Sequence, residues 1–121
     1  GGNGGTSAWV FSHSILESPD VLMVGMDLSY PPGTNIRNMQ YYDILMEIIP
    51  DRPEDGIVEV FNPHLGETWL TDLAYYWYYH SFKEMAKLAS CRTYNCTEGG
   101  ILFGEKIEFT TIDDALEKIS K

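Results

Sequence analysis

The chain has 121 residues, enough for one small domain, and 18 acidic residues against 8 basic ones give it a formal net charge of -10. This balance disfavours nucleic acid as a partner, because nucleic acid selects basic surfaces. An anionic substrate would instead need backbone N–H groups, a helix end or a divalent cation. No apolar stretch approaches 18 residues and no signal-like segment opens the sequence. We therefore expect a cytoplasmic protein without a membrane span.

A glycine-rich stretch, GGNGGTS at residues 1–7, opens the sequence. Dense apolar residues follow it and predict a helix that is capped by Thr6 or Ser7 and ends near Ser18. The N-terminus of such a helix presents unpaired N–H groups and a partial positive charge, which suits a phosphate. The alternative is a flexible end without function, since the stretch is not the dinucleotide-binding pattern.

The almost continuously apolar run 21–26 predicts a short strand that is buried on both faces. Asp27 follows it directly. In an open parallel sheet, ligands bind at the carboxyl ends of the strands, so Asp27 and the proline-containing loop 29–35 are candidates for a binding site. A carboxylate that merely caps a turn is the alternative interpretation of Asp27.

Two helices and a strand are predicted in the middle of the chain. Asn35 can cap a helix through Ile49, and 57–61 forms a β-branched second strand that leads into the loop 62–67. Thr68 or Thr71 then opens the longest helix, which runs to about Ala89. Helical spacing predicts that its buried stripe consists of Leu70, Leu73, Ala74, Trp77, Ser81, Met85 and Leu88, with Phe82 beside it. Four tyrosines surround its other faces, which indicates that helix 68–89 is covered by a missing domain or by the partner in a homodimer.

The C-terminal part contains a third short strand, 93–96, which runs into a turn, 97–100, that ends in two glycines. Glycines at that place allow a tight turn or a close approach to a ligand. Residues 101–109 add an irregular edge segment, and Thr111 caps a last amphipathic helix through Ser120. The alternation of helices and strands predicts an α/β fold with a parallel sheet. Cys91 and Cys96 are expected to be buried free thiols.

Three stretches resemble a known family in their order and spacing: GNGGTSA at 2–8, VGMDLSY at 24–30 and NCTEGG at 95–100. They are similar to the C-terminal part of the Rossmann-like domain that motility-associated factor (flagellin) glycosyltransferases share with archaeal 6-hydroxymethylpterin diphosphokinases. The segment 66–72 also looks like that family's pattern. The resemblance covers nearly the whole chain. It implies a mostly parallel three-layer sandwich in which residues 1–121 form one Rossmann-like domain, the C-terminal half of a larger one.

The chain resembles bacterial Rossmann-type sialyltransferases more distantly. In those enzymes a histidine shortly before a helix acts as the base, and His64 falls near that position. Both resemblances imply a nucleotide-activated donor. Our leading hypothesis is a glycosyltransferase that uses a sugar nucleotide, with His64 as general base and Asp27 orienting a hydroxyl group or binding a metal. The residues expected to hold the nucleotide are Gly2, Asn3, Gly4, Gly5, Thr6, Ser7, Asn95, Thr97, Glu98 and Gly99.

Two other functions stay open. The first is diphosphate transfer from ATP to a pterin alcohol, for which Asp27 and Glu98 would hold Mg²⁺. The second is a non-catalytic, truncated domain that dimerises through helix 68–89. Both transferase hypotheses require that the glycine-rich stretch, Asp27 and the segment 95–100 converge at one edge of the sheet.

Overall fold

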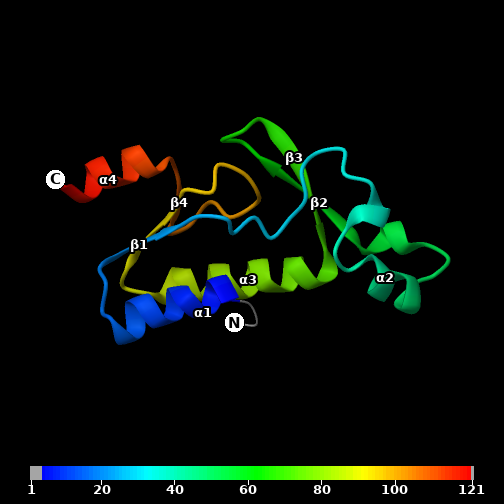
Figure 1. Cartoon of the computed structure of the whole chain (residues 1–121), viewed down its shortest axis with the longest axis horizontal. Helices are drawn as coiled ribbons and strands as arrows, with labels where there is room; N and C mark the ends of the chain where they lie inside the picture. Colours follow the sequence, from blue (N-terminus) through cyan, green and yellow to red (C-terminus); the bar gives the residue numbers. More distant parts are fainter. Residues whose placement is uncertain (1–3, 121) are drawn as a thin grey trace.

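A three-stranded parallel sheet forms the centre of the molecule, for which a computed structural model describes residues 4–120. Its strands are β1 (Asp20–Met23), β4 (Arg92–Asn95) and β5 (Ile107–Phe109), in the order β1-β4-β5. Helix α1 (Gly4–Val10) continues as a π-helical turn, η1 (Phe11–Ile15), and lies beside helix α3 (Leu73–Leu88) on one face of the sheet (Figure 1). Helix α4 (Ile112–Ser120) lies on the other face. The predicted α/β class is confirmed.

Trp9 joins the first helix layer to the sheet. Its indole N–H donates to Thr93 Oγ1 on β4 at 2.9 Å, and its ring centroid lies 4.9 Å from that of Phe82 on α3. Both aromatic side chains are buried, and each contributes roughly 1.5–3 kcal/mol through the apolar surface it removes from water. The opposite face of β1 and β4 packs against α4, where Leu22, Tyr94 and Cys96 meet the helix residues Ala115 and Ile119.

Strand β1 is shorter than its sequence predicts. It ends at Met23, and its residues alternate between half-buried and buried, because α4 covers one face only in part. Val24 is 65% exposed, and Gly25 turns the chain with a φ of 78° that side chains disfavour. The expectation of a strand through Met26 buried on both faces was therefore wrong.

The described part of the glycine-rich stretch is the first turn of a helix, so the expectation that Thr6 or Ser7 caps this helix was wrong. Gly4, Gly5, Thr6 and Ser7 all belong to α1, and Gly1, Gly2 and Asn3 lie outside the described residues. Thr6 and Trp9 are buried on the same side of this helix, so packing outweighs the low helix propensity of the glycines.

The middle of the chain contains a hairpin that the sequence does not predict. Strand β2 (Ile57–Asn62) is found where expected, but it pairs antiparallel with β3 (Glu67–Asp72) outside the central sheet. The helix start at Thr68 or Thr71 was therefore wrong. Helix α3 begins at Leu73 instead, because the carboxylate of Asp72 accepts a hydrogen bond from the backbone N–H of Tyr75 at 2.9 Å and caps the helix.

The face that α3 buries also differs from the predicted stripe. Trp77 is 69% exposed and Leu88 is 83% exposed, whereas Tyr79, Phe82 and Ala86 are buried. Because aromatic residues surround α3, several of its faces could be buried. The contact with Trp9 determines that the face containing Phe82 is the buried one.

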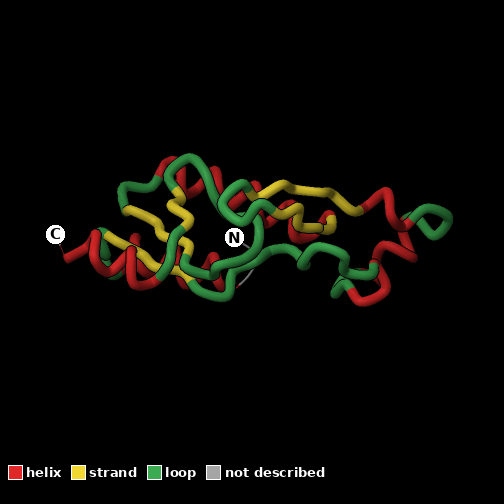
Figure 2. The backbone as a smooth tube through the Cα atoms, turned by 90° about the horizontal axis from the view of Figure 1, so that it is seen from above, coloured by secondary structure: helices red, strands yellow, loops and turns green. Residues whose placement is uncertain are grey.

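The predicted helix over 35–49 is divided into a 3₁₀ turn, η2 (Ile36–Asn38), and helix α2 (Tyr42–Ile48). Asn35 caps the first of these, since its Oδ1 accepts from the N–H of Arg37 at 2.9 Å. A second 3₁₀ turn, η3 (Pro53–Gly56), leads into β2. Figure 2 shows this part of the chain at the opposite end of the molecule from the C-terminal helix. Between residues 4 and 120, no helix is long and apolar enough to cross a membrane.

We expect Gly100→Ala to destabilise the chain much more than Gly104→Ala. Both glycines have positive φ values, 84° and 87°, so each alanine costs about 1–2 kcal/mol of backbone strain. At Gly100 a Cβ would also lie 2.6 Å from the carbonyl oxygen of Asp27 and 2.7 Å from its Cα, whereas at Gly104 it meets nothing within 4 Å. The overlap adds about 1–3 kcal/mol, measurable as a lower free energy of unfolding in urea. Equal losses in the two variants would contradict the close approach of the two loops.

Candidate functional site

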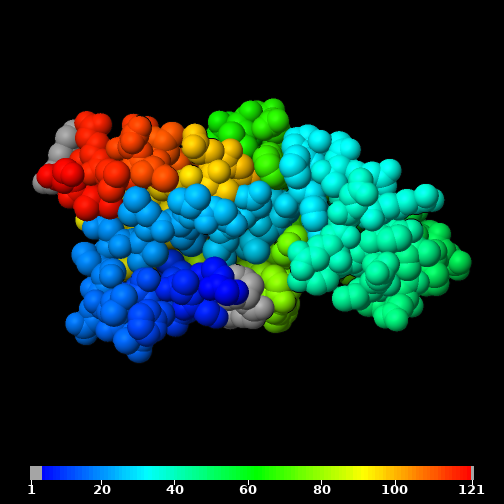
Figure 3. Space-filling model, in the orientation of Figure 1, coloured from blue at the N-terminus to red at the C-terminus, as the bar shows by residue number. Residues whose placement is uncertain are grey.

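A cleft of about 640 Å³ lies between helix α1, strand β1 and the loop that follows this strand. Figure 3 shows the first helix and the segment after β1 side by side on the visible face. The residues that line the cleft are Gly4, Gly5, Ala8, Trp9 and Ser12 from the first helix, residues 21–30, and Tyr75 from α3. The cleft therefore includes the carboxyl end of a parallel strand, where α/β folds bind their ligands.

Asp27 is the one ionisable group with an ordinary pKa below 7 among the described residues that line this cleft. Burial raises the pKa of its carboxyl group above the usual value, because the charged form loses hydration. No lysine or arginine stands among those lining residues either. The site therefore combines one partly desolvated carboxylate with otherwise uncharged walls.

The turn that follows β4 fixes the backbone around Asp27. The Oγ1 of Thr97 accepts a hydrogen bond from the N–H of Met26 at 3.1 Å, and the N–H of Ile101 donates to the carbonyl oxygen of Asp27 at 3.4 Å. The hydroxyl of Ser29 donates to the same oxygen at 2.8 Å. Gly100 packs directly against this backbone, so the Asp27 loop and the segment 95–100 do meet.

Asn95 is fully buried and shapes this turn. Its Nδ2 donates to the carbonyl oxygen of Leu102 at 2.9 Å, and its Oδ1 accepts from the N–H of Thr97 at 3.1 Å. Glu98 is exposed at a positive φ of 63°, and Gly99 lies against the ring of Trp69. The expected nucleotide ligands Asn95, Thr97, Glu98 and Gly99 do not line the cleft. Their segment instead supports the Asp27 loop from outside the cleft.

The first turn of α1 forms one wall of the cleft through Gly4 and Gly5. Thr6 is buried, Ser7 is exposed, and neither lines the cleft. Of the residues expected to hold a nucleotide, the structure thus brings Gly4 and Gly5 together with Asp27 around one hollow.

Two tyrosines that the sequence analysis did not assign to the site, Tyr30 and Tyr75, form another wall. Their ring centroids are 5.5 Å apart, and the hydroxyl of Tyr75 donates to Oε1 of Gln40 at 2.5 Å. The hydroxyl of Tyr30 donates to the buried Asp72 at 2.7 Å and accepts from the N–H of Gln40 at 3.0 Å. Burial raises the pKa of both tyrosines. The next cause is the hydrogen bond to Asp72 for Tyr30 and the charge of Asp72 for Tyr75, so both hydroxyl groups stay neutral. No local pattern links residue 30 to residue 75, which is why sequence reasoning missed this wall.

Tyr30 also pairs with β3, and this pairing joins the two ends of the long segment 31–69. Tyr30 and Leu70 exchange two backbone hydrogen bonds, of 2.6 and 3.0 Å, so β3 lies directly beside the Asp27 loop. The buried carboxylate of Asp72 then holds Tyr30 and the start of α3 together.

His64, the predicted general base, lies in the exposed turn between β2 and β3. Its ring stacks on Phe109, with centroids 5.1 Å apart, and meets Phe103 edge-on at 5.7 Å. Asn62 fixes this turn, because its Nδ2 donates to the carbonyl oxygen of Gly100 at 2.9 Å and its Oδ1 accepts from the N–H of His64.

His64 lines a separate depression of about 520 Å³ that also contains Arg92 and Lys106. The structure does not bring His64 and Asp27 into one cleft.

Residues 4–120 contain no group of three or more His, Cys, Asp or Glu side chains that could hold a metal ion. Glu98, the second expected ligand, lies in an exposed turn and does not line the cleft. These residues do not make a cage for Mg²⁺. Mg²⁺ that is bound mainly through substrate phosphates, however, needs only one or two carboxylates, and Asp27 fits that smaller requirement.

We expect Asp27→Asn to stabilise the chain at neutral pH. The pKa of Asp27 is raised in the folded state, so folding favours the protonated form, and the free energy of unfolding falls as pH rises through the two pKa values. The gain in the variant should be present near pH 7 and vanish below about pH 4, the ordinary pKa of aspartate. Urea unfolding at both pH values measures it.

Glu84→Gln is the matched control, because Glu84 is exposed on α3 and its loss also relieves the excess of negative charge. Equal gains in the two variants would contradict a special environment for Asp27.

No protein-family model matches this chain, and no curated protein or solved structure is significantly similar to it. The case for a function therefore rests on the geometry of the cleft.

Proposed function

We propose that this chain is a Rossmann-like domain of a nucleotide-dependent transferase, and that the cleft around Asp27 holds the sugar part of a sugar-nucleotide donor. The observation that carries the proposal is the combination of three features in one hollow: the start of a helix, the carboxyl end of a parallel strand, and one desolvated carboxylate. Together they can bind phosphate, position a substrate and accept a proton.

The first turn of α1 is suited to the phosphates of the donor. Gly4 and Gly5 line the cleft without side chains, and a Cβ at Gly4 would meet nothing within 4 Å, so a ligand can approach the backbone closely. Backbone N–H groups at a helix start bind anions without a lysine or arginine. This mode of binding fits a chain with a net charge of -10.

The tyrosine wall is suited to the sugar. Tyrosine combines a large apolar ring with a polar hydroxyl group, and a sugar likewise presents apolar faces with a rim of hydroxyl groups. Tyr30 and Tyr75 are held in place by Asp72 and Gln40, so their rings are ordered before a ligand binds. Asp27 would then accept a hydrogen bond from a hydroxyl group in the cleft.

The transfer step needs a base that removes the proton of the acceptor hydroxyl group, and Asp27 in the cleft can act as this base. The hydroxyl oxygen of an acceptor forms a new bond to the anomeric carbon of the donor, while the bond from that carbon to the phosphate oxygen breaks and its electron pair leaves with the nucleotide. The proton of the acceptor hydroxyl passes to Asp27. Its raised pKa makes the ionised carboxylate a stronger base than an exposed aspartate. A Mg²⁺ ion bound with the donor would neutralise charge on the leaving phosphate.

Titration calorimetry tests donor binding. UDP-N-acetylglucosamine, GDP-mannose and CMP-N-acetylneuraminic acid represent the three common nucleotide types, and ATP is the comparison. We expect one sugar nucleotide to bind with a dissociation constant in the micromolar range, as is common for enzyme substrates. Failure of all three to bind would overturn the proposal, as would consumption of ATP in the presence of a hydroxymethylpterin and Mg²⁺.

We expect Asp27→Asn to slow hydrolysis or transfer of the bound sugar nucleotide by about 10²–10⁴-fold, the usual contribution of a general base. The affinity for the donor should change far less, and Glu84→Gln should behave like the unmodified chain. Release of free nucleotide, followed by chromatography, measures the rate. Full activity of the Asp27 variant would remove Asp27 from the mechanism.

A further inference from the structure

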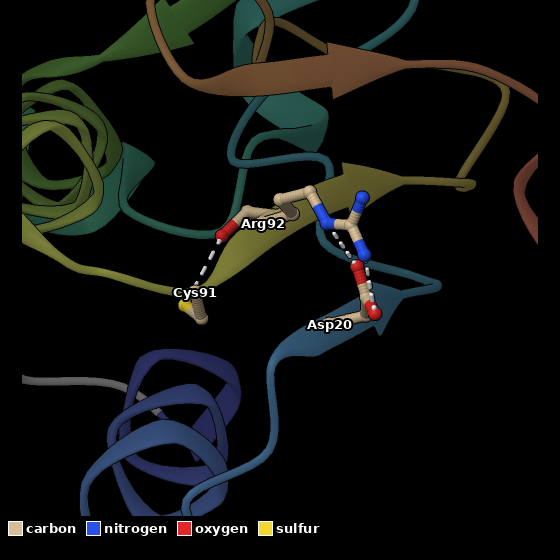
Figure 4. Close-up of polar contacts among 4 residues, drawn as sticks. Asp20, Cys91 and Arg92 are labelled. Atoms are coloured by element: carbon tan, nitrogen blue, oxygen red, sulfur yellow. Dashed lines mark hydrogen bonds and ion pairs between the residues drawn. The ribbon is translucent and has the colours of Figure 1, made fainter. Parts of the chain in front are cut away.

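The carboxylate of Asp27 has no partner of opposite charge within residues 4–120. The ion pairs in this part of the chain do not include Asp27, and no hydrogen bond reaches its side-chain oxygens. Asp20, at the other end of β1, is paired with Arg92 of β4 through contacts of 2.6 and 3.0 Å, and Figure 4 shows the Arg92 side chain reaching across to it. Because carboxylates that lose water are normally paired, the counter-charge for Asp27 has to come from a ligand.

The tyrosine wall beside Asp27 is electron-rich. The hydroxyl of Tyr30 donates to the carboxylate of Asp72, and the hydroxyl of Tyr75 donates to Oε1 of Gln40. A phenol that donates a strong hydrogen bond is polarised by its acceptor, and electron density moves into its ring. The faces of aromatic rings attract cations, and more so when the rings are rich in electrons.

Asp27 lies within electrostatic reach of this wall. Burial, then the charge of Asp72 and then the charge of Asp27 raise the pKa of the Tyr75 hydroxyl. One cation in the cleft can therefore interact with the carboxylate of Asp27 and with the tyrosine rings at the same time. The negative charge of Asp72 behind the wall adds to the attraction.

The residues that line the cleft favour an organic cation over a metal ion at this place. A divalent metal ion prefers several oxygen ligands, whereas Asp27 is the one carboxylate among the described lining residues. An ammonium group needs one carboxylate and aromatic surface, and its carbon skeleton packs against tyrosine rings. The combination of Asp27, Tyr30 and Tyr75 therefore fits an amine.

We infer that the sugar of the donor carries a free amino group, whose ammonium form binds between the carboxylate of Asp27 and the rings of Tyr30 and Tyr75. The inference rests on the proposed function, because it specifies the sugar that this cleft would hold. A carboxylate has two oxygens, so one can pair with the ammonium group while the other accepts the proton of the acceptor. The ammonium group also favours the ionised form of Asp27, which is the form that a base needs.

Binding of small glycosides tests the inference on the full chain, whichever nucleotide the donor contains. The probes are methyl glucoside and its 2-amino, 3-amino and 6-amino derivatives at neutral pH with EDTA, followed through the NMR shifts of the Asp27, Tyr30 and Tyr75 amides. We expect at least one amino glycoside to bind about tenfold tighter than methyl glucoside. Its N-acetylated form has no charge and should bind like methyl glucoside. Equal affinities of the amino and neutral forms, or no shifts with any probe, would overturn the inference.

The variants Asp27→Asn and Glu84→Gln separate a specific ion pair from the general negative charge of the chain. Both remove one carboxylate, but Glu84 is exposed on α3 and does not line the cleft. We expect Asp27→Asn to weaken binding of the amino glycoside about tenfold and to leave that of methyl glucoside nearly unchanged. The Glu84 variant should keep the preference for the amine. A preference that survives in Asp27→Asn would overturn the inference.

The variants Tyr75→Phe and Tyr75→Leu test the aromatic ring. Phenylalanine keeps the ring and loses only the hydroxyl, so the affinity for the amino glycoside should fall by less than about threefold. Leucine removes the ring, and the affinity should fall about fivefold or more. Thermal unfolding checks that both variants are folded, and the Asp27 variant tests the same site without changing Tyr75. Equal affinities of the two Tyr75 variants would overturn the inference.

The inference and the proposed function fail in different experiments. A chain that binds a sugar nucleotide but does not distinguish amino from neutral glycosides would overturn this inference and leave the proposed function standing. A chain that prefers the amino glycoside but binds no sugar nucleotide would overturn the proposed function and leave the amine site in place.

Discussion

The close contact between the Asp27 loop and the turn after β4 is the constraint on which the rest of the structure depends. Gly100 allows this approach because it has no side chain, and Thr97 and Ile101 supply the hydrogen bonds that hold the loop in place. The contact brings the carboxyl ends of β1 and β4 to one rim and places Asp27 in the same cleft as the first helix. A carboxylate on a rigid loop keeps its geometry when it loses water, and its raised pKa reflects that cost.

A second polar centre, the buried Asp72, organises the opposite wall. It caps α3, accepts the hydroxyl of Tyr30, and so fixes a tyrosine wall that is built from the Asp27 loop and α3, with Gln40 between them. A fully buried carboxylate is favourable only when several donors satisfy it, which these contacts do. One carboxylate, Asp72, is thus satisfied and structural behind the tyrosine wall, and another, Asp27, lines the cleft and is available for a ligand.

Much of the architecture can be predicted from the sequence, because β-branched runs, glycine turns and caps are local signals. Strands near 57–61 and 93–96, the caps at Asn35 and Thr111, and the α/β class all follow from such signals. Strand β3 does not follow from them, since a segment such as ETWLTD suits a helix start as well as a strand. Only its pairing with β2 makes this segment a strand.

The site is harder to predict than the fold. Asn95 has the chemistry of a ligand-binding residue, yet burial commits its amide to the turn, and Tyr75 reaches the cleft only through the tertiary fold.

The paired hydrogen bonds between Tyr30 and Leu70 have an evolutionary consequence. They bring together the two ends of the excursion formed by residues 31–69, so the sheet and the helices beneath it do not depend on the length of that insert. Loop length costs little once its ends are fixed. Insertions between η2 and β2 can therefore accumulate during evolution while the region around Asp27 keeps its shape.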